Sequence, residues 1–140
     1  HLERTFLLPD SVAVIDCGTS IRDILFDLLL SPQKPRKMII VDVTDSVNLA
    51  PGEIREISID QIRPEKISDF SLHQFPTTNM LKEIKEETPI DVRVFVAQVA
   101  GLPSEVRPGL SEPVRSAIAP SSERILAEIG SAANMGGRDD

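Results

Sequence analysis

The sequence has 140 residues, of which 41% are hydrophobic and 26% charged, a composition typical of one soluble globular domain. It carries 22 acidic and 15 basic residues, and the net charge of −7 argues against nucleic acid or an anionic membrane as the main partner. The single cysteine, Cys17, excludes an internal disulfide and fits a reducing cytoplasm.

Four runs of apolar and β-branched residues predict strands. Val12–Asp16 and Met38–Asp42 are continuous apolar runs that end in Asp, a pattern typical of parallel strands buried on both faces. Glu53–Ile59 carries charges and alternates less regularly, so we expect it near an edge of the sheet. Val92–Val99 is rich in valine, and we expect it to be an inner strand together with the first two runs.

Between these runs the apolar residues recur with helical spacing. The stripe from Ile21 to Leu29 predicts a helix that ends before Pro32. Residues 76–87 have one apolar face and one charged face, which predicts a second helix. Residues 114–129 keep helical phase across Pro120 and predict either a kinked helix or two short ones.

Strands that alternate with helices in this way predict an α/β fold: a three-layer domain in which helices cover both faces of a mostly parallel, twisted sheet. We assign residues 1–130 to this single domain and residues 131–140 to a flexible tail. The apolar residues between Leu2 and Leu8 look like the end of a helix, so we expect the domain to be incomplete at its N-terminus.

Three acidic residues follow the predicted strands closely. In open α/β sheets, ligands bind outside the carboxyl ends of the strands. Asp16 ends the first strand, Asp42 ends the second, and Asp45 follows three residues later. For Asp16 and Asp45 we favour a structural role, in which the carboxylate binds loop amides or caps a helix. Asp42 is the stronger candidate for chemistry because it adjoins the most apolar strand and has Asp45 nearby.

The only histidine away from the N-terminus is His73, in a predicted loop that leads into the helix of residues 76–87. An exposed loop histidine is the ordinary interpretation, but Leu72, Phe75 and Pro76 would hold His73 against the domain. A carboxylate and an imidazole can together bind a divalent ion such as nickel or zinc. A third ligand is still needed, and the sequence offers no other internal histidine.

The order of several segments resembles a known family. VAVIDCGT, MIIVDVTD and LAPGEIREI are followed by a loop histidine before a helix, and then by a valine-rich strand and PGLSEPVRSAI. Together they resemble the NiFe-hydrogenase maturation endopeptidases, and the resemblance runs from Val12 to Ile129. The segment AQVAGLPSEVRPGLS looks most similar to the branch that serves deazaflavin-coenzyme-reducing hydrogenases of methanogens.

The resemblance implies a cytoplasmic, nickel-dependent endopeptidase that removes the C-terminal extension of a nickel-loaded NiFe-hydrogenase large-subunit precursor. Enzymes of this family recognise the nickel, which arrives with the substrate, through two carboxylates and a histidine. In this sequence the Asp of the family's VDxxD motif falls on Asp42 and its loop histidine on His73. Both are therefore expected to be catalytic and metal-binding residues, and neither a membrane nor nucleic acid is expected as a partner.

The family also begins with a strand and a GNxxxxDDGxG loop that supplies the other carboxylate, and this sequence contains no such motif. We therefore expect a gap or an exposed edge in the sheet. Two other functions stay open. The chain could be a non-catalytic α/β binding module that docks on the hydrogenase large subunit. It could also be an unrelated small-molecule-binding domain, although that predicts a phosphate-binding glycine loop, which the sequence lacks.

Overall fold

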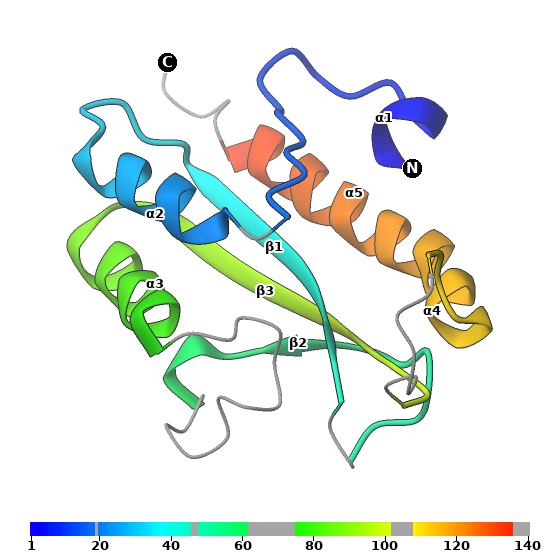
Figure 1. Ribbon diagram of the computed structural model, residues 1–140. Helices are drawn as coiled ribbons and strands as arrows, with labels where there is room; N and C mark the ends of the chain where they lie inside the picture. Colours follow the sequence, from blue (N-terminus) through cyan, green and yellow to red (C-terminus); the bar gives the residue numbers. More distant parts are fainter. Residues whose placement is uncertain (19, 46–47, 62–74, 102–107, 136–140) are drawn as a thin grey trace.

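The computed structural model describes residues 1–18, 20–45, 48–61, 75–101 and 108–135 (Figure 1). These residues form a three-stranded sheet of β1 (Lys37–Thr44), β3 (Asp91–Gln98) and β2 (Ile54–Ile57), in that spatial order. β1 runs parallel to β3 over eight residue pairs, from Lys37↔Asp91 to Thr44↔Gln98. β2 runs antiparallel to β3. The sheet is therefore mixed, with its longest pairing parallel.

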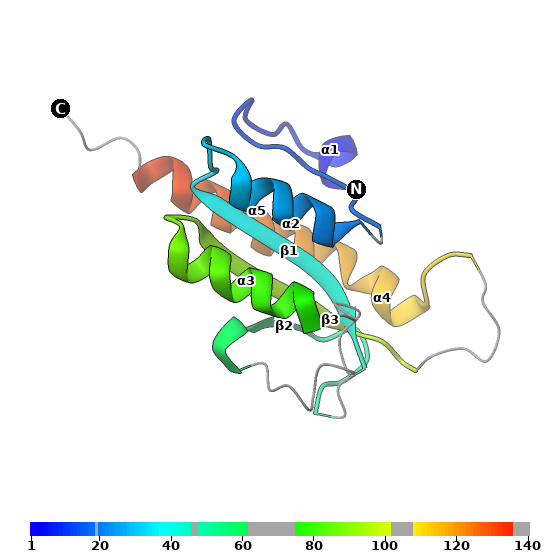
Figure 2. The same cartoon turned by 60° about the vertical axis from the view of Figure 1, so that its left-hand side comes forward.

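Helices cover both faces of this sheet. The described helices are α1 (Leu2–Thr5), α2 (Ile21–Leu30), the short 3₁₀ helix η1 (Ile59–Gln61), α3 (Phe75–Glu87), α4 (Glu112–Ser116) and α5 (Ile118–Met135). In Figure 2, α2 and α3 lie in front of the sheet and α5 lies behind it. The expected three-layer α/β architecture is confirmed. None of the described helices combines the length and the apolar composition that spanning a bilayer requires.

The face of the sheet that carries α2 and α3 holds the main hydrophobic core. Successive strand residues point to opposite faces, so Ile40 of β1 and its register partner Val94 of β3 both point toward these helices. The other buried members of the core are Leu25, Ile59, Leu81, Ile84, Ile90 and Val96. The apolar stripes that predicted α2 and α3 are the surfaces that this core buries.

The opposite face packs against α5 and mixes apolar with charged groups. Phe95 is buried there, and the guanidinium of Arg124 lies 5.0 Å from the centroid of its ring. Beside it, Arg93 pairs with Glu56 of β2 and, at 3.3 Å, with Glu128 of α5. Lys37 of β1 reaches the same Glu128 carboxylate at 2.8 Å. These ion pairs connect all three strands to α5.

The expectation that Val12–Asp16 forms an inner strand is wrong. This segment has no regular secondary structure and belongs to no sheet, and its Ile15 is 62% exposed. A strand is stable only when a neighbour satisfies its backbone groups, and none of the described strands pairs with this segment. The run of β-branched residues is therefore not sufficient to make a strand here.

The expectation that Met38–Asp42 lies inside the sheet is also wrong for the three strands that the structure describes. β1 is an edge strand, and only β3 has a neighbour on both sides. Val41, in the middle of β1, is 50% exposed as a consequence. The predicted edge position of the segment within Glu53–Ile59 is confirmed, because β2 forms the other edge.

The C-terminal helical region is divided as predicted, but the break precedes the proline. α4 ends at Ser116 and α5 begins at Ile118, so Pro120 lies in the first turn of α5. That position tolerates proline because the first N–H groups of a helix have no partner within the helix. α5 continues to Met135, five residues beyond Gly130, where we expected the domain to end.

Candidate functional site

The carboxyl ends of β1 and β3 bring three polar side chains to one face of the sheet. Asp42 is the register partner of Val96, and Thr44 is the register partner of Gln98. Because strand residues alternate between faces, these polar residues follow Ile40 and Val94 on the face that carries α2 and α3. The apolar core thus gives way to a polar surface where the two parallel strands end, which is the place where α/β sheets bind ligands.

Asp42 is half-buried and its carboxylate is oriented by its own strand. The backbone N–H of Val43 donates a hydrogen bond to Asp42 Oδ1 at 2.8 Å. Thr44, two residues further along, is only 2% exposed. The carboxylate predicted from the sequence is therefore held by backbone at the carboxyl end of the edge strand β1, with the fixed orientation that a metal-binding or substrate-binding acid needs.

Gln98 is a polar residue of this surface that the sequence analysis did not single out. Its side chain is 5% exposed, and its Nε2 donates a hydrogen bond to the backbone oxygen of Val99 at 2.8 Å. Its Oε1 is buried and accepts no hydrogen bond from the described residues. The alternation of Val94, Val96 and Gln98 along one strand face is the signal that could have drawn attention to it.

The backbone of Gln98 also fixes the rim beside the strand ends. Gly52 N–H donates to Gln98 O at 2.8 Å, and Gln98 N–H donates to Glu53 O at 2.9 Å. Gly52 has a φ of +81°, and a Cβ at this position would lie 2.7 Å from the backbone oxygen of Pro113 in α4. Only glycine fits both demands, so the turn before β2 packs tightly between β3 and α4.

The Glu53 side chain closes this turn. Its Oε2 accepts a hydrogen bond from Ala50 N–H at 3.0 Å, and its Oε1 pairs with Arg55 at 2.7 Å. The hydrogen bond from Ala50, followed by the one from Arg55, lowers the pKa of the Glu53 carboxyl. Glu53 is thus an ionised group that stabilises the turn rather than a group poised to exchange protons.

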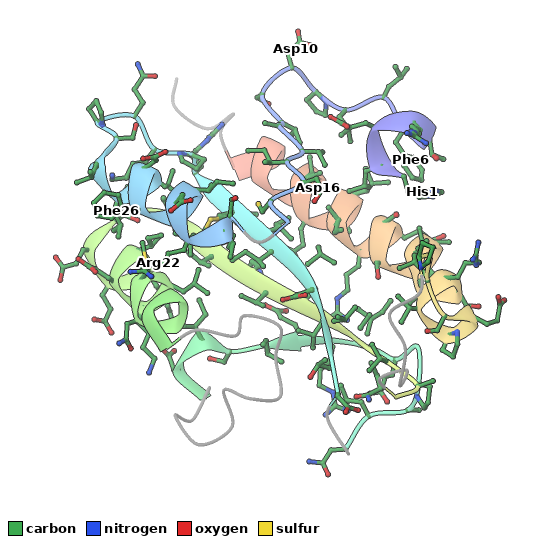
Figure 3. All side chains as sticks on the ribbon, viewed as in Figure 1. His1, Phe6, Asp10, Asp16, Arg22 and Phe26 are labelled. Atoms are coloured by element: carbon green, nitrogen blue, oxygen red, sulfur yellow. The ribbon has the colours of Figure 1, made fainter. Side chains whose placement is uncertain are left out.

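The other two predicted acids are Asp16 and Asp45. Asp16 Oδ1 accepts a hydrogen bond from Gly18 N–H at 3.1 Å, in the segment that leads into α2 (Figure 3). This is the loop-amide role that we favoured for it. Asp45 is exposed and directly follows β1.

His73 lies outside the described residues, so its distance from Asp42 stays a prediction. Within the described part of the chain, no group of three or more His, Cys, Asp or Glu residues is arranged to hold a metal ion. A shallow hollow lined by Glu56, Lys85 and Val92 lies toward the other end of β3 and does not include the Asp42 surface.

Comparisons with known proteins point to one family. Residues 1–128 match the family model described as hydrogenase maturation protease. A protein of Methanocaldococcus jannaschii named for the same kind of protease is 36% identical over 123 residues, which cover 87% of this chain and 77% of that protein. The coenzyme F420 hydrogenase subunit delta of Methanothermobacter thermautotrophicus is 35% identical over 123 residues, with 87% and 73% covered.

Among solved structures, the hydrogenase maturating endopeptidase HybD from Escherichia coli is similar to this chain with a TM-score of 0.62 and 25% sequence identity. The match covers 94% of this chain and 78% of that one. Sequence and fold therefore point to the same group of proteins.

Proposed function

The chain belongs to the hydrogenase maturation protease family, and from this premise we propose that it cleaves the C-terminal extension from a NiFe-hydrogenase large-subunit precursor that already carries nickel. The observation that carries the proposal is the placement of Asp42. Its half-buried carboxylate lies at the carboxyl end of the parallel strand β1, where a backbone N–H orients it.

The donors on this surface suit a metal that the substrate brings with it. One carboxylate, from Asp42, lies on the described strand ends, and His73 is proposed to add an imidazole nitrogen. Two such donors suit a borderline divalent ion such as nickel but are too few to hold it alone. A nickel ion that keeps its other ligands from the precursor needs only these additional donors, so binding selects the loaded precursor.

The reaction itself is the hydrolysis of one peptide bond. Water adds to the carbonyl carbon, the C–N bond breaks, and the new amine takes up a proton. Nickel held near the scissile bond would supply Lewis-acid polarisation of the carbonyl. In this proposal Asp42 and His73 align the nickel-bearing part of the precursor with the protease.

The similarity to a coenzyme F420 hydrogenase subunit supports a narrower substrate. We propose that the precursor belongs to a hydrogenase that reduces a deazaflavin coenzyme. We also place the reaction in the cytoplasm, since the sequence contains one cysteine and so forms no internal disulfide.

The test is a cleavage assay with the full-length protein on nickel-loaded and nickel-free large-subunit precursor. We expect cleavage of the loaded precursor alone. Asp42→Asn removes a charged ligand and should slow cleavage by about 100-fold, and His73→Ala should slow it comparably by removing a nitrogen donor. Asp10→Asn is the matched control, because Asp10 is an exposed carboxylate remote from the strand ends (Figure 3).

Two results would refute the proposal. Equal cleavage of the empty precursor would show that nickel is not recognised, and full activity of Asp42→Asn would show that the site lies elsewhere. Tight binding of the loaded precursor without any cleavage would favour the non-catalytic docking module instead.

A further inference from the structure

The Gln98 carboxamide has an acceptor that the described structure leaves unused. The side chain is 5% exposed, yet Oε1 accepts no hydrogen bond from any described residue. Buried polar atoms in folded proteins nearly always have a partner, so an exception requires a physical explanation. A binding site that receives its partner from outside is one such explanation.

The orientation of this carboxamide is fixed. Nε2 donates to Val99 O at 2.8 Å, and an amide oxygen at that position would face another oxygen with no proton between them. The backbone of Gln98 is also engaged, with Glu53 O and with Gly52 N–H. Every other polar group of the residue is therefore satisfied within the fold, and Oε1 alone is left as an acceptor.

Gln98 also lies close to the proposed site around Asp42. Gln98 lies directly across from Thr44 and shares the sheet face of Asp42, one strand away and two residues further along. The strand spacing and the rise per residue place the two backbone positions roughly 8 Å apart. An extended peptide that passes the Asp42 carboxylate therefore also passes Gln98, but Oε1 is itself covered, so contact with it requires that docking moves the groups that cover it.

We propose that Gln98 positions the substrate polypeptide, with Oε1 accepting a hydrogen bond from a backbone N–H of the segment that is cleaved. This inference rests on the proposed function. A peptide that enters a partly buried site must satisfy its own N–H groups, and a neutral amide oxygen is a suitable acceptor for one. Nickel is a less fitting partner, because carbonyl oxygens suit harder cations such as magnesium and calcium.

The experiment compares Gln98→Met and Gln98→Leu with wild type in the full-length protein, using nickel-loaded precursor. Both substitutions keep a side chain of similar bulk and remove the acceptor. We expect kcat to fall about tenfold, the effect of losing one hydrogen bond, while KM stays within about twofold. KM is unaffected because the rest of the precursor surface supplies affinity, whereas Gln98 aligns only the scissile segment.

Unfolding in urea separates this role from a structural one. The substitutions remove an unsatisfied buried acceptor but also the hydrogen bond from Nε2 to Val99 O, so these opposing effects should leave the unfolding midpoint close to that of wild type. Ser122→Ala is the matched control: Ser122 is 4% exposed, but its hydroxyl donates to Ile118 O on α5, so its loss should leave kcat unchanged.

The outcomes distinguish the inference from the function on which it rests. If wild type does not cleave the precursor, the proposed function fails and the inference fails with it. If wild type cleaves and both Gln98 variants keep full kcat, only the inference is overturned. It is also overturned if kcat falls only in proportion to the folded fraction, or if binding of Ni²⁺ alone weakens in the variants, since that would make Gln98 a metal ligand.

Discussion

The polar groups at the two ends of β3 differ in whether they have a partner within the described structure. Toward the amino end, Arg93 lies between Glu56 and Glu128, and Lys37 binds the same Glu128, so each charge has a partner. At the carboxyl end, Gln98 Oε1 has none among the described residues. Paired charges join strands to a helix, whereas a buried acceptor without a described partner can gain one when a ligand docks. The difference separates the part of the sheet that stabilises the fold from the part that we assign to substrate.

The largest loss of stability is expected from Gly52→Ala, at the carboxyl end. An alanine there must adopt a φ of +81° and place its Cβ against Pro113 O, so we expect the free energy of unfolding to fall by about 3 kcal/mol. Gly18→Ala is the control, because Gly18 also has a positive φ, +49°, but has nothing within 4 Å. Equal losses in urea denaturation would mean that the close packing against α4 contributes nothing.

Arg93→Met tests the ion pairs near the amino end of β3. Glu56 and Glu128 would lose a charged partner in a half-buried setting, and we expect a loss of about 2 kcal/mol in unfolding free energy. Cleavage per folded molecule should not change. Arg115→Met removes an exposed pair with Glu112 and should cost less than about 0.5 kcal/mol. A similar cost for both variants would remove the distinction between the network and an ordinary surface pair.

The pH dependence of stability should depend on the same network. The hydrogen bond from Arg93 lowers the pKa of the Glu56 carboxyl, and that from Lys37 lowers the pKa of Glu128. Carboxyls with a lowered pKa in the folded state stabilise the protein above their ordinary pKa of 4.5, and that contribution is lost as pH falls through the folded value.

We therefore expect the unfolding free energy of wild type to decrease between about pH 5 and about pH 3, and to decrease less in Arg93→Met. Urea titrations across this interval measure both slopes. Parallel curves for the two proteins would show that the Arg93 pairs do not set the acid sensitivity.

The smallest expected effect concerns Arg124, whose guanidinium lies 5.0 Å from the Phe95 ring centroid. Arg124→Met keeps an apolar stem over the ring and removes the cation, so the loss should be about 0.5 kcal/mol. A double-mutant cycle with Phe95→Leu measures the coupling between the two side chains. A coupling energy of zero would show that the contact between Arg124 and the Phe95 ring does not stabilise the packing of α5.

Local pattern predicted β1, β3, α2, α3 and α5 because their apolar spacing matches the faces that they bury. It failed at Val12–Asp16, where the pattern of a buried strand occurs without a neighbour to pair with. Pattern predicts what a segment can form, while pairing depends on segments elsewhere in the chain.

The same limit applies to the polar groups. Asp42 could be predicted because it ends an apolar run, and strand ends bind ligands. The Lys37–Glu128 pair joins residues 91 positions apart, which no local pattern reveals. Gln98 was missed because its significance is a missing partner in three dimensions, and one glutamine in a valine-rich strand does not show that.

The most direct test measures Asp42→Asn and Arg93→Met side by side, for cleavage of nickel-loaded precursor and for unfolding free energy. We predict that Asp42→Asn loses about 100-fold in cleavage with little change in stability, and that Arg93→Met loses stability but cleaves normally while folded. Normal cleavage by Asp42→Asn, or lost cleavage by fully folded Arg93→Met, would contradict the assignment of the carboxyl strand ends to catalysis.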